Sequence, residues 1–141
     1  LIMGDNEFKS KLEMISFYFP AYSFKFKGNG KPLKLLSTYN IDYAEKDDDR
    51  NQVKIQIVTT IFDEEKNFDL SLTALGFFRL ERENFSEEIA NEILIKNTVA
   101  IMMPFIRSQV SLLTTQPGLT PILLQPIDVN ALVDNAPTES K

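Results

Sequence analysis

The chain has 141 residues, and its 20 acidic and 15 basic side chains give a formal net charge of −5. This length predicts a single domain over residues 1–141. The absence of Cys and His excludes disulfides, Ser–His and Cys–His nucleophiles, and the usual ligands of zinc, haem and iron–sulfur clusters. An acidic chain without a basic cluster is also a poor partner for nucleic acid, because neutralising phosphates requires a basic face.

The beginning of the chain carries no secretion signal, which would be a basic region, an apolar run and a small-residue cleavage site. The longest uncharged stretch, 108–127, is interrupted by Pro117, Gly118 and Pro121. A membrane span needs about 20 mostly apolar helical residues. We therefore expect a cytoplasmic protein without membrane insertion.

Residues 13–81 have the composition of a β-sheet. Runs rich in β-branched and aromatic residues predict strands over 13–27, 33–44, 52–62 and 68–80. The third run is the clearest, because Val53, Ile55 and Ile57 alternate with polar residues. Short turns between the runs predict a four-stranded antiparallel sheet with meander or Greek-key-like connections. With the helices that follow, this is an α+β fold.

Residues 86–115 predict a long helix on one side of that sheet. Ser86 is a good N-cap, and Glu87 lies where a helix favours negative charge. Its first half carries a polar stripe, whereas 99–106 is almost entirely apolar and contains Pro104, which should kink the helix.

The end of the chain predicts three further segments. A crossover loop rich in Pro and apolar residues is expected over 116–127, and a short helix over 128–134 with Asp128 as its N-cap. The tail 135–141 is rich in polar residues and is expected to be disordered.

The long helix has more apolar surface than one sheet can cover. Between residues 97 and 127 the single charged residue is Arg107, and a helix that is apolar all round must be covered on both sides. We therefore expect self-association through this helix; burial under the loop 116–127 alone is the alternative. The predicted interface residues are Ile95, Val99, Met102, Met103, Ile106 and Val110.

The acidic runs 47–49 and 63–65 are the remaining candidates for catalysis or metal binding. Each lies where a turn is expected, and neither has the spacing of a calcium loop. Residues 28–30 form a Gly-containing turn rather than a phosphate-binding loop. We therefore predict a protein that is not an enzyme and that has no cofactor and no metal.

Four short motifs, taken in order, resemble the SecB family of protein-export chaperones. They are Ile-Ser-Phe at 15–17 followed by Pro20, the run from Ile101 to Arg107 around Pro104, Gly-Leu-Thr-Pro at 118–121, and Pro-Ile-Asp-Val-Asn-Ala-Leu at 126–132. Each motif alone is weak, but their order and spacing cover nearly the whole chain.

The resemblance implies a homotetramer, assembled as a dimer of dimers, that binds unfolded or partly folded polypeptide along apolar grooves and has no catalytic site. Several binding sites acting on one chain would make weak individual contacts tight. For each groove residue, a place in the intramolecular core is the alternative. The predicted client-binding residues are Tyr22, Phe24, Phe26, Leu33, Leu35, Leu119, Ile122, Leu123, Leu124, Val129, Leu132 and Val133.

The family resemblance also implies a translocation ATPase as partner, contacted through acidic residues on the open sheet face. The corresponding positions here are Met14, Tyr18, Asp69 and Ser71, and none keeps the family's residue. Three hypotheses therefore remain: a general chaperone with or without a role in export, a chaperone dedicated to one client such as the antitoxin of a toxin–antitoxin pair, and a non-catalytic α+β domain that binds a small ligand or has a structural role.

Overall fold

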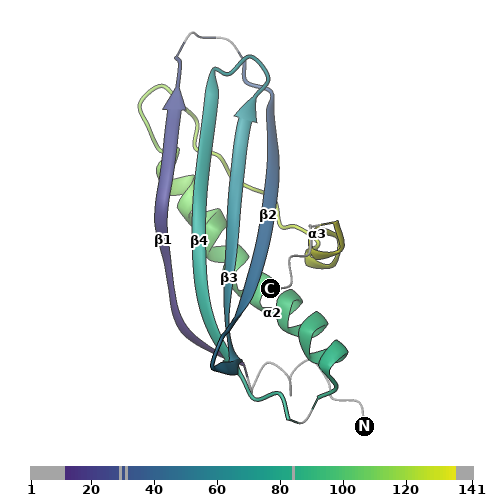
Figure 1. The fold of residues 1–141 in the computed structure, drawn as a ribbon. Coiled ribbons are helices and arrows are strands. Elements are labelled where there is room, and N and C mark those ends of the chain that lie inside the picture. Colours follow the sequence, from purple (N-terminus) through teal and green to yellow (C-terminus); the bar gives the residue numbers. More distant parts are fainter. Residues whose placement is uncertain (1–11, 29, 31, 84, 136–141) are drawn as a thin grey trace.

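The computed structural model describes residues 12–28, 30, 32–83 and 85–135, and it confirms the predicted α+β class. The elements in chain order are strands β1 (Leu12–Phe26), β2 (Leu35–Lys46), β3 (Asp49–Asp63) and β4 (Phe68–Leu80), then helices α2 (Glu87–Leu113) and α3 (Val129–Asn135) (Figure 1). The predicted disordered tail lies outside the described residues, apart from residue 135, which ends α3.

The four strands form one antiparallel sheet in the order β1-β4-β3-β2. Strands β2, β3 and β4 are joined by successive hairpins, whereas β1 pairs with β4, so the connection 27–34 runs from one edge of the sheet to the other (Figure 1). Three interstrand spacings are about 14 Å, and eight residues can span about 26 Å. The sheet therefore combines a meander with a Greek-key-like return.

The hairpin between β2 and β3 is tighter than the sequence predicted. Strand β2 extends to Lys46 and β3 begins at Asp49, and these two residues pair across the turn. Asp47 and Asp48 of the acidic run 47–49 form the turn, as predicted, and Asp49 is the first residue of β3. The strands extend further toward the turn than predicted because cross-strand pairing satisfies the backbone of charged residues as well as that of apolar ones.

Helix α2 crosses one face of the sheet, and the core lies between them. Alternate residues of β3 and β4 are fully buried on this face, among them Ile57 and Leu72, and they meet Met102 and Ile106 of α2. Each such side chain contributes about 1.5–3 kcal/mol by leaving water. Gly76 of β4 permits close approach, because a Cβ there would lie 3.0 Å from the Met102 sulfur.

The predicted N-cap of α2 is confirmed. The Oγ of Ser86 accepts a hydrogen bond from the Ile89 N–H, and Glu87 and Glu88 occupy the first turn. The helix continues through Pro104, which lies on its exposed side. By length and composition α2 could cross a membrane, but its apolar stripe is buried against the sheet, which is the arrangement of a core helix.

The crossover that follows α2 is held by side-chain hydroxyls. The Oγ1 of buried Thr114 accepts the Ile122 N–H at 2.8 Å, and the Oγ of Ser111 donates to the Ile122 carbonyl at 2.8 Å. Gly118 has a positive φ of 82°, which favours glycine. Asp128 then caps α3, because its Oδ1 accepts the Asn130 N–H at 3.0 Å.

Candidate functional site

A groove of about 690 Å³ opens at the end of the sheet where β1 ends and β2 begins; we call it the end groove. The crossover forms its other wall. Its lining side chains are apolar apart from Lys27 and Thr120, although polar atoms make up a large part of its exposed surface. The lining residues are Phe26, Lys27, Gly28, Gly30, Leu33, Leu35, Pro117, Gly118, Leu119, Thr120 and Ile122.

The end groove brings together five of the predicted client-binding residues from three separate segments. They are Phe26, Leu33, Leu35, Leu119 and Ile122. All five are half-buried and pack against the core. Each of these side chains is therefore held in part by the core and exposed in part to solvent. No client is present to test their role.

Tyr22 and Phe24 extend the same face of β1 away from the end groove. Phe24 and Phe26 pair across the ladder with Leu70 and Phe68 of β4, and their rings lie 5.2 and 6.2 Å from that of Phe68. Tyr22 is 58% exposed. The aromatic side chains of the edge strand β1 thus continue the apolar surface beside the end groove.

A second groove, of about 430 Å³, lies between α2 and the crossover; we call it the helix groove. It contains two more predicted residues, Leu123 and Leu124, and Leu123 is 74% exposed. The remaining lining residues are Pro104, Arg107, Ser108 and Ser111. Neighbouring residues of the crossover thus line different grooves: Ile122 lines the end groove, and Leu123 and Leu124 line the helix groove.

Helix α3 contacts α2 and is seen to the right of β2 in Figure 1. Val129 and Leu132 are half-buried against the core and line neither groove. The side chain of Val133 lies outside the described residues.

The predicted interface residues of α2 lie mostly inside the chain. Val99, Met102, Met103, Ile106 and Val110 belong to the core, and Ile95 is half-buried against it. Their spacing of three or four residues is that of a stripe packed on a sheet. Buried residues have no surface left for a second subunit, so their role in an interface stays a prediction without support from this packing.

A different part of α2 carries exposed apolar side chains, which the sequence reasoning did not single out. Ile89, Phe105 and Leu112 are 51%, 47% and 68% exposed. The Phe105 ring lies 5.2 Å from that of Phe17 on β1. The seven-residue spacing from Phe105 to Leu112 was the available signal, because residues seven apart share one helix face.

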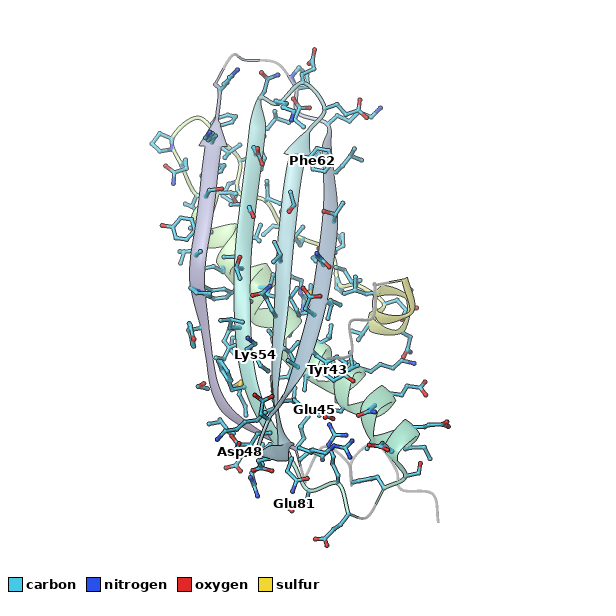
Figure 2. All side chains as sticks on the ribbon, in the orientation of Figure 1. Tyr43, Glu45, Asp48, Lys54, Phe62 and Glu81 are labelled. Atoms are coloured by element: carbon cyan, nitrogen blue, oxygen red, sulfur yellow. The ribbon has the colours of Figure 1, made fainter. Side chains whose placement is uncertain are left out.

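Charged residues gather at the opposite end of the sheet, around the β2–β3 hairpin. Figure 2 shows Glu45, Asp48 and Glu81 at this end, with Phe62 toward the other. Arg82 is 12% exposed; its Nε donates to the Arg50 carbonyl at 2.8 Å, and its Nη2 lies 3.1 Å from the Glu45 carboxylate. Its Nη1 donates to the Asn91 amide oxygen at 2.7 Å. Arg82 thereby ties the hairpin to α2.

Two carboxylates at this end have lowered pKa values. The Arg50 guanidinium, which donates a hydrogen bond to Glu87, holds the pKa of Glu87 below its usual 4.5. The Asn51 N–H, and then the Gln52 amide, lower the pKa of Asp49 below 3.8. We call the set Glu45, Arg50, Arg82 and Glu87 the hairpin clamp.

Of the four positions that the family resemblance implies for motor contact, Tyr18, Asp69 and Ser71 lie on the open face of the sheet, whereas Met14 pairs across the ladder with Phe78, whose side chain is in the core. Met14 and Tyr18 are 42% and 48% exposed, and the Tyr18 ring stacks on Phe77 at 6.2 Å. This surface is therefore partly apolar, whereas the family resemblance implies acidic residues there. Asp69 keeps a carboxylate, and it pairs across the ladder with Lys25.

The described residues include no group of three or more His, Cys, Asp or Glu side chains close enough to hold a metal ion. The two grooves offer apolar area, a few hydroxyls and single cations. Such surfaces can bind an extended or partly folded chain.

Comparisons with known proteins agree with this geometry. A structure of the SecB-like chaperone of Mycobacterium tuberculosis, in complex with a ChAD peptide from the HigA1 antitoxin, matches with a TM-score of 0.69 and 12% identity, covering 88% of this chain and 93% of that one. A protein of unknown function from Streptococcus agalactiae matches at a TM-score of 0.43 and 14% identity, over 82% and 97% of the two chains, which is too distant to support an inference. No curated protein sequence matches.

The family described as preprotein translocase subunit SecB matches residues 12–139. This match covers almost the whole chain and agrees with the sheet, the long helix and the short final helix. The chain therefore belongs to the SecB family of non-enzymatic chaperones.

Proposed function

We propose that this chaperone is a holdase that binds non-native polypeptide in the end groove and the helix groove. The end groove is the observation that carries the proposal. Apolar side chains from β1, β2 and the crossover come together there, pack against the core and remain partly exposed. Apolar area that leaves water contributes about 25 cal/mol per Å², so a client with apolar side chains gains affinity without a defined sequence.

The proposed client site is bounded by segments that differ in their attachment. Phe26 and Leu35 belong to paired strands, whereas the crossover is held to α2 by hydrogen bonds at Thr114 and Ser111. A loop wall can adapt to different side chains more easily than a strand. This combination suits a site that must accept many sequences.

Assembly into a dimer or homotetramer is part of the same proposal. The exposed apolar side chains Phe105 and Leu112 of α2 leave a surface that self-association would cover. Several grooves on one assembly could then hold one long client, and the combined affinity would exceed that of a single groove.

The test measures the native mass and the suppression of client aggregation with one preparation. We expect an oligomer that slows aggregation of an unfolded model protein at stoichiometric concentration. The double variant Leu35→Arg with Leu123→Arg should lose this effect, since it places charge in both grooves. A monomer without anti-aggregation activity would contradict the proposal.

A matched control comes from the same strand. Leu35 pairs with Asp63 and faces the helix, whereas Leu36 pairs with Phe62 on the open face and is 44% exposed. Leu36→Arg should therefore leave aggregation suppression unchanged, while Leu35→Arg alone should reduce it. Equal losses in both variants would move the client site away from the end groove.

A second candidate function is service to a single antitoxin client. The M. tuberculosis chaperone was solved with an antitoxin peptide, and the positions of Met14 and Tyr18 lack the carboxylates implied for motor contact. A dedicated chaperone should bind its own client at least about 100-fold tighter than unrelated unfolded chains. Competition between an antitoxin encoded beside this protein and a generic client would distinguish the two, as would measurement of binding to the translocation ATPase.

A further inference from the structure

Arg107 is the single charged residue between residues 97 and 127, and it lines the helix groove. It lies on the exposed flank of α2 next to Pro104 and Ser108, and it is half-buried. Leu123 and Leu124 of the crossover form the opposite wall. A guanidinium therefore stands in a groove that otherwise contains apolar groups and hydroxyls.

Arg107 differs from every other arginine in the described part of the chain. Arg50, Arg79 and Arg82 each have at least one carboxylate oxygen within 4.0 Å. Arg107 has no such partner among the described residues, although the chain has five more acidic than basic side chains (20 − 15). A partly desolvated cation without a counterion is costly, and a bound carboxylate would remove that cost.

The neighbours of Arg107 support an external partner. Burial raises the pKa of the Tyr39 phenol on β2 above its usual 10.0, although the nearby charge of Arg107 acts to lower it. Tyr39 is therefore neutral near pH 7 and is not a counterion for Arg107. Ser111 already donates its hydroxyl to the Ile122 carbonyl. None of the six lining residues is acidic.

We propose that Arg107 binds a carboxylate side chain of the client, so that the helix groove prefers apolar segments that contain an Asp or Glu. The inference rests on the proposed function and deepens it, because it names the client chemistry of one groove. Arginine suits this role, since its planar fork can bind a carboxylate through two parallel hydrogen bonds. The apolar walls beside it would strengthen the contact by excluding water.

The test compares two labelled peptides that differ in one group. Both are acetylated and amidated, so that terminal charges are absent, and both carry an apolar segment with either Glu or Gln at its centre. Binding is measured by fluorescence anisotropy with the full chain. We expect the Glu peptide to bind about tenfold tighter, in line with a charged hydrogen bond in place of a neutral one.

The variants assign this preference to a residue. Arg107→Gln should bind both peptides with the affinity that the parent has for the Gln peptide, and Arg107→Lys should retain part of the preference. Lys54→Gln removes the same charge from an exposed position on the open face (Figure 2) and should leave the preference unchanged.

The outcomes separate this inference from the proposed function. Equal affinity of the parent protein for the two peptides would overturn the role of Arg107 and leave the holdase function standing, and this comparison needs no variant to fold. A preference that persists in Arg107→Gln would also overturn it. Failure of both peptides to bind would contradict the proposed function, and the inference with it.

Discussion

The two ends of α2 are joined to the sheet by different interactions. At its beginning, Glu87 bonds to Arg50 and Asn91 bonds to Arg82, so charged side chains connect the helix to the β2–β3 hairpin. At its end there is no acidic residue, and the hydroxyls of Thr114 and Ser111 hold the crossover. Ion pairs connect the N-terminal end of α2 to the hairpin, whereas both grooves lie at its apolar C-terminal end.

This difference separates the anchor of the helix from the surface available to a client. Ion pairs need specific partners at short range, and each residue of the hairpin clamp has an ionic partner within the chain. Apolar side chains have no such requirement, and those of the crossover can exchange contacts with water for contacts with a client. We therefore expect changes at the two ends to have different effects on stability and on binding.

The largest expected effect comes from the middle of α2, where two adjacent residues face opposite ways. Ile106 is fully buried and Phe105 is 47% exposed. Ile106→Glu should destabilise the fold by more than about 3 kcal/mol, because it buries an unpaired charge. Phe105→Glu should remain folded and, under the assembly proposal, should lower the native mass.

Thermal unfolding and light scattering of the two variants check this prediction. By contrast, the interface role that the sequence predicts for Ile106 would make Ile106→Glu change the assembly rather than the fold. A stable, folded monomer of Ile106→Glu would indicate that Ile106 lies in a subunit interface, and it would contradict the packing described above.

A smaller effect is expected where the crossover is attached. Thr114→Val keeps the shape of the side chain but removes the acceptor of the Ile122 N–H, and an unsatisfied buried donor costs about 1–3 kcal/mol. We expect faster amide exchange in residues 117–124 and weaker client binding, with α2 otherwise intact. Thr115→Val, at the exposed neighbouring position whose hydroxyl donates back to the Ser111 carbonyl of the helix, is the control. Unchanged exchange at Ile122 would show that packing alone holds the loop.

The smallest effect concerns pH and the hairpin clamp. The folded pKa of Glu87 is below 4.5, so its contribution to stability is present above the unfolded pKa and is lost as pH falls through the folded value. The unfolding temperature should therefore decline between about pH 5 and 3, and Glu87→Gln should make that decline shallower. Glu88→Gln is the matched neighbour, and an equal change in both variants would argue against the Arg50 contact.

The sequence predicted the strands and helices well, because their signals are local. Alternation at Val53, Ile55 and Ile57 indicated β3, and Ser86 indicated the start of α2. The order of the strands was less determined, since no local pattern states that β1 pairs with β4 rather than β2. The contacts of Arg82 with Glu45, Arg50 and Asn91 were also not predicted, because they join residues 9 to 37 positions apart.

For the candidate site, the sequence determined which side chains are apolar and which cation stands among them, since composition needs no fold. The tertiary structure decided their places. It brought Phe26, Leu35 and Ile122 to one groove, and it turned Met102 and Ile106 toward the sheet. The reason is that an apolar side chain gains similar free energy from any apolar neighbour. The local sequence therefore predicts that such a side chain is buried. Which residues it contacts depends on how elements distant in the chain pack together.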